Sequence, residues 1–196
     1  MELPDQHIRD RLRVKTVGIA GCGGLGSNCA VALARVGVGH LVIADFDIIE
    51  RSNLNRQYFF AGQVGQYKAL AVKDIIQRID PGINVEAHVL TLDENNIPIL
   101  FNGCDVIVEA FDKAGMKQMI IETVAEKLPG KKLVSGVGLA GWGNSDIIMC
   151  KSYSNLFVCG DLTHEVSEGY PPLAPRVGIV ANMQANQVLE ILLGKM

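Results

Sequence analysis

The sequence predicts an α/β fold in which helices cover both faces of a doubly wound, mostly parallel sheet with a C-terminal antiparallel extension. Short apolar runs alternate with segments of helical periodicity along almost the whole chain. Hydrophobic residues make up 48% of the 196 residues, which fits a sheet that is buried on both faces. No apolar run approaches the ~18 residues of a membrane span. We therefore expect a single domain over residues 1–196 that does not enter a membrane.

The charge and the cysteine content exclude several classes of protein. Lys and Arg number 18 and Asp and Glu 21, for a net charge of −3, so the surface is not built to coat nucleic acid. The five cysteines are scattered and include no CxxC pair, so we predict neither a disulfide framework nor a zinc site. The first 15 residues contain no apolar stretch of the signal-peptide type, and we expect a cytoplasmic protein.

The first two strands frame a glycine-rich turn and a helix. Residues 14–20 form an apolar, β-rich run that ends in a glycine cluster. Apolar residues then recur at helical spacing up to Val36, and Gly37 and Gly39 end this helix. A second strand is predicted over residues 41–46, where it ends in acidic residues. This order of strand, turn, helix and strand is the first half of a doubly wound fold.

A long polar stretch separates the second strand from the next helix. Residues 48–65 show no periodicity and are longer than the ~2–6 residues of an ordinary connection, and such loops are usually functional. The remaining pattern predicts further helices over residues 67–79, 93–101, 114–128 and 176–193. It also predicts strands over residues 83–90, 105–110 and 132–137, followed by a hairpin of residues 146–150 and 156–159.

The glycine-rich turn matches the pattern GxGxxG between a strand and a helix. Gly21, Gly23, Gly24 and Gly26 allow a sharp turn and a close approach of the backbone to phosphates at the helix N-terminus. Asp45 follows 24 residues after the first glycine, near the ~20 expected of an acid that binds ribose hydroxyls. The alternative is a turn needed only for packing. This motif alone does not distinguish NAD from ATP.

A second group of polar residues follows the acid at the end of the second strand. Asn53, Arg56 and Gln57 lie in the long polar stretch, and Lys68 opens the next helix. Two cations near a phosphate-binding turn suit a triphosphate better than a dinucleotide, because the turn already neutralises one pyrophosphate. The alternative is that Arg56 and Lys68 are ordinary solvated surface charges.

A third element is the carboxylate of Asp112. This residue follows the apolar run over residues 105–110, at the edge where doubly wound sheets bind ligands. There it could hold Mg²⁺ against phosphate oxygens. The alternative is that Asp112 is the N-cap of the helix that begins at Ala114.

Together these motifs resemble the ThiF/MoeB family of ubiquitin-activating-type adenylyltransferases, and most of all its short ThiF type. The matching segments, in order, are GCGGLGS, DFD, SNLNRQ, VGQYK, AFDK, LVSGVGLAG and LAPRVGIVANMQANQVLEILLG. The resemblance covers residues 14–194 and implies a Rossmann-like fold. It also implies that ATP and Mg²⁺ adenylate the C-terminal Gly-Gly carboxylate of a ThiS-like, ubiquitin-fold sulfur carrier protein, which releases pyrophosphate during synthesis of the thiamine thiazole. A homodimer is expected.

The resemblance also implies roles for individual residues. The glycines around Gly24 would hold the phosphates, Asp45 the ribose, and Asn53, Arg56 and Lys68 the triphosphate. Asp112 would hold the Mg²⁺, so the catalytic residues are expected to be Arg56, Lys68 and Asp112. Cys159 is a candidate for handling sulfur, and the alternative is a buried strand cysteine.

Other functions stay open at this stage. The carrier could instead be of the molybdopterin type, or the protein could be a tRNA-modifying relative. Outside adenylation, the chain could be a nucleotide-binding module without catalysis, or an NAD-dependent oxidoreductase that uses only the glycine turn and Asp45.

Overall fold

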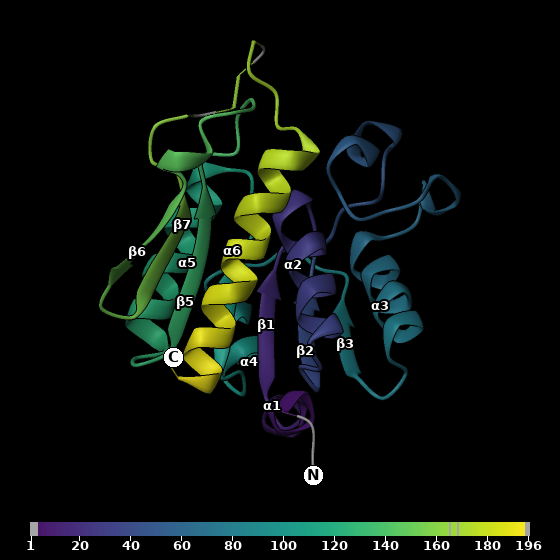
Figure 1. The fold of residues 1–196 in the computed structure, drawn as a ribbon, viewed down its shortest axis with the longest axis vertical. Helices are drawn as coiled ribbons and strands as arrows, with labels where there is room; N and C mark the ends of the chain where they lie inside the picture. Colours follow the sequence, from purple (N-terminus) through teal and green to yellow (C-terminus); the bar gives the residue numbers. More distant parts are fainter. Residues whose placement is uncertain (1–3, 165, 168, 195–196) are drawn as a thin grey trace.

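The computed structural model describes residues 4–164, 166–167 and 169–194. Its strands form one seven-stranded sheet (Figure 1). The order of the strands in the sheet is β3-β2-β1-β4-β5-β7-β6, and neighbouring strands are parallel except that β6 runs antiparallel to β7. The strands are β1 (Thr16–Ala20), β2 (His40–Ala44), β3 (Asn84–His88), β4 (Val106–Glu109), β5 (Lys132–Val137), β6 (Met149–Tyr153) and β7 (Leu156–Gly160).

Helices cover both faces of the sheet, as the sequence predicts. The helices are α1 (Pro4–Arg13), α2 (Gly24–Arg35), α3 (Lys68–Ile79), α4 (Asn96–Phe101), α5 (Ala114–Lys127) and α6 (Ala174–Leu193), and the short 3-10 turns are η1 (Arg51–Asn55), η2 (Ala61–Gln63) and η3 (Ser145–Ile147). The buried side chains of α2, α3 and α6 pack in one apolar core, and those of α4 and α5 in a second. The α/β, Rossmann-like doubly wound fold is confirmed.

The order in which the chain adds strands to the sheet reverses between β1 and β4. From β1 the chain adds β2 and β3 on one side, and it then crosses back to add β4 and β5 on the other. Ligands of doubly wound folds bind at such a switch point, beyond the carboxyl ends of the strands. All four residues of β4 are buried, which is expected of a central strand covered on both faces.

The fold differs from the sequence-based expectation at its first helix and in its C-terminal hairpin. The helix α1 was not predicted, because Leu12 is its one residue classed as buried among those whose side chains are described, and it gives no apolar period. In the C-terminal hairpin, β7 adds to β5 in parallel, so that only β6 runs antiparallel. The strand β6 also begins three residues later than predicted, because η3 takes up residues 145–147.

The turn between α3 and β3 ties α1 to the sheet. The amide of Gly82 donates a hydrogen bond to Asp80 at 2.8 Å, and the Arg13 guanidinium donates another at 2.9 Å. The hydrogen bond from Gly82, followed by that from Arg13, holds the pKa of the Asp80 carboxyl below its usual value.

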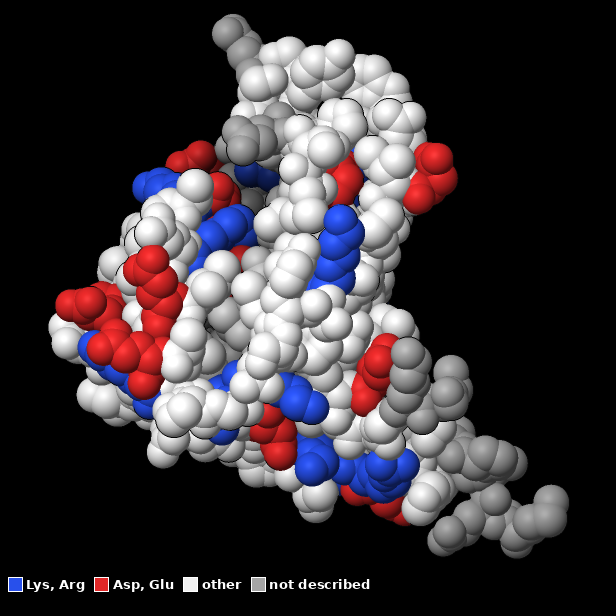
Figure 2. Space-filling model, turned by 90° about the vertical axis from the view of Figure 1, so that its left-hand side faces the viewer, with Lys and Arg blue, Asp and Glu red and all other residues white. Residues whose placement is uncertain are grey.

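The surface shows no large patch of one charge where β6 forms the edge of the sheet. Figure 2 shows acidic and basic side chains interspersed on that side of the molecule, with uncharged surface between them. Within the described residues, no helix combines the length and the apolar character needed to cross a bilayer.

Candidate nucleotide-binding site

The glycine-rich turn brings the end of β1 into close contact with the first turn of α2. Gly21 has a φ of +96°, which favours glycine. A Cβ on Gly26 would overlap the carbonyl oxygen of Gly21. Gly23 is the N-cap of α2 and has no side chain to cap it, so no side-chain hydrogen bond occupies the first amides of the helix. Such amides, together with the helix dipole, form an anion-binding site.

Asp45 lies directly beside this turn. Its carboxylate accepts a hydrogen bond from the amide of Cys22 at 2.6 Å and another from the amide of Asp47 at 2.7 Å. Burial raises the pKa of Asp45, while those two hydrogen bonds and the Lys68 ammonium oppose the shift. Each carboxylate oxygen can accept a second hydrogen bond, so Asp45 keeps acceptor capacity for the ribose hydroxyls that it is expected to bind.

Lys68 is a buried cation at the same edge of the sheet. Only 6% of the residue is exposed, and its ammonium pairs with the Asp47 carboxylate at 2.8 Å. Its positive charge opposes the rise that burial causes in the pKa values of Asp45 and of Cys22 in the glycine-rich turn. An ammonium has three donors, so Lys68 can bind a phosphate while it keeps Asp47.

Arg56 covers the start of α2 from the polar loop. The position of a Cβ on Gly24 would be 3.6 Å from the Arg56 Cγ, so the arginine stem runs along this glycine. The guanidinium donates to the Asn55 side chain at 2.8 Å and to the Ser52 carbonyl at 3.3 Å. These bonds use one terminal nitrogen, which leaves the remaining donors of the guanidinium for an anion.

Two amide side chains of the polar loop have different roles. Asn53 holds η1 in shape, because its oxygen accepts the amide of Glu50 at 3.1 Å. Gln57 is only 8% exposed, and its side-chain oxygen has no hydrogen-bond partner in the described part of the chain. Its side-chain nitrogen lies 3.8 Å from the position of a Cβ on Gly23. Leaving a buried acceptor unpaired costs ~1–3 kcal/mol, which a bound hydroxyl, amino group or water would recover.

Asp112 is exposed beyond the carboxyl end of β4. Among the described residues, its carboxylate makes no hydrogen bond or ion pair. The N-cap of α5 is Lys113 and has no side-chain capping bond. The alternative that Asp112 caps this helix is therefore wrong, and the residue lies after β4 at the carboxyl edge of the sheet.

The turn that leads to Asp112 rests on a buried ion pair that the sequence analysis did not predict. The Glu109 carboxylate has no exposed surface and pairs with the Lys117 ammonium at 2.9 Å. It also accepts hydrogen bonds from the amide of Phe111 at 2.7 Å and from the Ser135 hydroxyl at 2.5 Å. Glu109 and Lys117 thus fix the backbone immediately before Asp112.

A second buried pair joins the N-terminus of α6 to the end of β7. The Arg176 guanidinium pairs with Asp161, and it donates to the carbonyls of Gly143 at 2.6 Å and Gly138 at 3.2 Å. The next residue, Val177, packs against Gly24 of the glycine-rich turn. The Arg176–Asp161 pair therefore fixes one wall of the site, although the sequence analysis assigned neither residue a role.

Two buried cysteines, Cys22 and Cys159, have raised thiol pKa values. Burial raises the pKa of the Cys22 thiol well above its usual value, which fits a small residue in a tight turn. Burial likewise raises the pKa of Cys159 in β7. No three His, Cys, Asp or Glu side chains gather into a metal-binding group in the described part of the chain.

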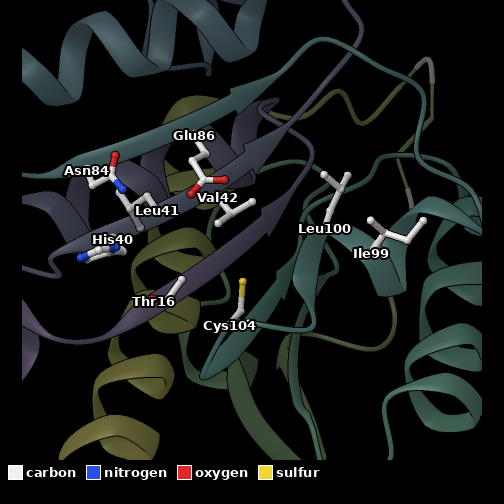
Figure 3. Close-up of a pocket in the computed structure, with 10 residues that line it drawn as sticks. Thr16, His40, Leu41, Val42, Asn84, Glu86, Ile99, Leu100 and Cys104 are labelled. Carbon is white, nitrogen blue, oxygen red and sulfur yellow. The ribbon is translucent and has the colours of Figure 1, made fainter.

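A separate cavity of about 340 Å³ opens at the opposite edge of the sheet (Figure 3). It is lined by Thr16, His40 and Asn84, the first residues of three strands, together with residues of the α4 segment. None of the residues predicted to bind nucleotide lines it. The candidate site is therefore the carboxyl edge, where the glycine-rich turn, Asp45, the two cations and Asp112 converge.

Comparison with known proteins agrees with this geometry, because residues 2–196 match the ThiF family. The chain belongs to the ThiF family. This ThiF-family chain is 33% identical, over 94% of its length, to the adenylyltransferase and sulfurtransferase UBA4 of Eremothecium gossypii, and it covers 43% of that protein. It is 36% identical, over 68% of its length, to the probable adenylyltransferase/sulfurtransferase MoeZ of Mycobacterium tuberculosis, and it covers 34% of that protein. It thus spans less than half the length of these relatives.

Solved structures share the fold of the ThiF-family chain. The tRNA N6-threonylcarbamoyladenosine dehydratase TcdA of E. coli, solved in complex with ATP, matches with a TM-score of 0.86 at 18% identity, over 95% of this chain and 89% of that chain. The E. coli protein MccB, also solved with ATP, matches with a TM-score of 0.73 at 23% identity, over 94% of this chain and 57% of that chain.

Proposed function

We propose that this ThiF-family chain uses ATP to adenylate the C-terminal carboxylate of a small ubiquitin-like carrier protein. The observation that carries the proposal is that two cations, Arg56 and Lys68, lie beside a phosphate-binding turn and an acid suited to ribose. The names of the curated relatives, adenylyltransferase and sulfurtransferase, support the same reaction class. Two proteins of the same fold were solved with ATP.

In the proposed reaction the carrier supplies its own nucleophile. A carboxylate oxygen forms a bond to the α-phosphorus of ATP, and the bond from that phosphorus to the bridging oxygen breaks, so that pyrophosphate leaves. Catalysis then requires positioning and charge stabilisation, without a nucleophilic side chain of the enzyme. The amides of α2 bind phosphate oxygens, and Arg56 and Lys68 stabilise the charge on the departing pyrophosphate.

The remaining residues orient the nucleotide. Asp45 accepts the ribose hydroxyls, and the buried amide of Gln57 offers one donor and one unpaired acceptor to the bound molecule. Mg²⁺, when bound, neutralises phosphate charge, and the exposed carboxylate of Asp112 is a hard oxygen ligand of the kind this ion prefers. Two cations beside the turn favour a triphosphate over the dinucleotide of an oxidoreductase.

We further propose a ThiS-like carrier in thiamine thiazole synthesis, a homodimer and a cytoplasmic location, with residues 1–196 acting as one ATP-binding domain. A molybdopterin-type carrier and a tRNA-modifying role are the alternatives within the family. Exchange of labelled pyrophosphate into ATP, measured with Mg²⁺ and each candidate carrier ending in Gly-Gly, separates them. Exchange that depends on one carrier, and that falls at least tenfold in Asp112→Asn, is the expected result.

The same assay can overturn the proposal. If ATP binds with Mg²⁺ present but no carrier supports exchange, the chain is a nucleotide-binding module without catalysis. If NADH binds and ATP does not, the oxidoreductase alternative is correct.

A further inference from the structure

The hairpin of β6 and β7 brings together two cysteines that lie nine residues apart in the sequence. Cys150 and Cys159 are directly opposite each other in the antiparallel register. Their sulfur atoms are 3.4 Å apart. We infer that these two thiols form a reversible disulfide site, which exchanges with low-molecular-weight disulfides.

The backbone of the hairpin already has the spacing that a disulfide needs. Opposed residues of an antiparallel pair have Cα atoms ~4.5–5.5 Å apart, within the ~4.4–6.8 Å range of disulfides. The sulfurs need to approach by about 1.3 Å to reach a bond length of ~2.05 Å. All five residues of β6 are exposed and the strand is the last in the sheet, so this strand can move without displacing the core.

The two thiols differ in their exposure to solvent, and this difference determines which thiol reacts first with an external disulfide. Cys150 is exposed and Cys159 is fully buried. The Cys159 thiol donates to the Cys150 sulfur, and the Cys150 thiol donates to the Gln187 side-chain oxygen on α6 at 3.3 Å. An external disulfide can therefore reach Cys150 first, and Cys159 is placed to attack the product.

The exchange balances with one small disulfide as the oxidant. The Cys150 thiolate attacks one sulfur of oxidised glutathione, forms a mixed disulfide and releases one glutathione thiolate. Cys159 gives up its proton to that thiolate or to solvent and attacks the Cys150 sulfur, which releases the second glutathione. Two protein thiols are oxidised, and one small disulfide is reduced to two thiols. Excess dithiothreitol reverses both steps.

Burial, together with the Glu190 carboxylate on α6, raises the pKa of the Cys150 thiol, although its hydrogen bond with Cys159 opposes the shift. Burial also raises the pKa of Cys159. Because the thiolate is the attacking species, the exchange is expected to accelerate as the pH rises above neutral.

Trypsin digestion gives a direct test, since Lys151 separates the two cysteines. The full-length chain is incubated with oxidised glutathione at pH 8, its free thiols are blocked with N-ethylmaleimide, and intact mass and peptides are measured. The expected result is the loss of two of the five thiols and a cross-link between the peptides of residues 133–151 and 152–176. Dithiothreitol should restore both thiols.

Single variants identify the order of attack. Cys159→Ser should stop at the mixed disulfide and gain the mass of one glutathione at Cys150. Cys150→Ser should remain unmodified, because Cys159 is buried, and Cys104→Ser should cross-link as the parent does. Five free thiols in the treated parent, or a cross-link that survives in Cys150→Ser, would overturn the inference. None of these outcomes depends on the proposed adenylation.

Discussion

Replacing Lys117 with methionine would leave the Glu109 carboxylate buried without its cation. Glu109 has no exposed surface, and Lys117 is the cation that pairs with it in the described structure. Methionine keeps most of the length and the apolar stem of lysine, so the change removes charge and donors with little change in packing. The hydrogen bonds from Phe111 and Ser135 would remain but carry no net charge.

The structure allows an estimate of the loss. Removing one partner of a buried ion pair costs ~3–5 kcal/mol of unfolding free energy. For a chain of this size, ~1 kcal/mol corresponds to about 2–4 °C in Tm, so we expect Lys117→Met to lower Tm by roughly 6–20 °C. Calorimetry and urea unfolding measure this change independently.

Two further variants separate charge burial from the loss of a surface lysine. Lys113→Met changes an exposed lysine at the start of the same helix and should shift Tm by less than about 2 °C. The double variant Glu109→Gln/Lys117→Met removes both charges and should be more stable than Lys117→Met alone. If Lys117→Met is no less stable than Lys113→Met, or if the double variant recovers nothing, the interpretation of Glu109 as a buried charge that needs its partner is refuted.

Three other predictions concern the glycine-rich turn, Asp45 beside it, and the loss of stability at acid pH. Gly26→Ala should lower the unfolding free energy by ~1–3 kcal/mol or more, because the added Cβ would overlap the backbone at Gly21. The matched control Gly178→Ala lies in open space within α6 and should raise Tm by about 2–4 °C. Equal shifts in the two variants would contradict the close contact at Gly26. Asp45→Ala should weaken ATP binding about 10–150-fold but leave 2′,3′-dideoxy-ATP binding nearly unchanged, measured by calorimetry. Asp80→Asn should lower Tm near pH 7, because the Asp80 carboxylate stabilises the fold only while it is ionised. The difference in Tm from the parent should vanish as the pH falls from about 4 through the lowered pKa of Asp80. A difference in Tm that does not depend on pH would contradict this.

The sequence predicts which residues of the candidate site meet at the carboxyl edge of the sheet, because these residues lie in local motifs. The glycines lie between a strand and a helix in one short segment, and Asp45 directly follows the next strand, so the topology of a doubly wound sheet must bring them together. Lys68 opens the following helix and lies at the same edge for the same reason. The local motifs thus place most of the site before any tertiary contact is known.

The buried pairs could not be predicted in this way. Glu109 and Lys117 face each other across a strand and a helix, and Arg176 reaches Asp161 from a different element, so neither pair has a fixed sequence spacing. The signal for the cysteine pair was present but weak. The hairpin turns at Ser154, whose φ of +57° is unusual for a residue other than glycine, and the sequence there lacks the Asn-Gly or Asp-Gly of common two-residue turns.

The position of the switch point has a consequence for how the protein folds. The strands β1 and β4 pair through residues such as Val17 and Val106, so their contact closes a loop of about 90 residues. The chain loses the conformational entropy of this loop before the strand pairing can stabilise the fold. The glycine-rich turn follows β1, and Asp112 follows β4. The complete candidate site therefore forms only after that long loop has closed. If the proposed ATP binding is followed during refolding, the time at which it appears would report when β1 and β4 have paired.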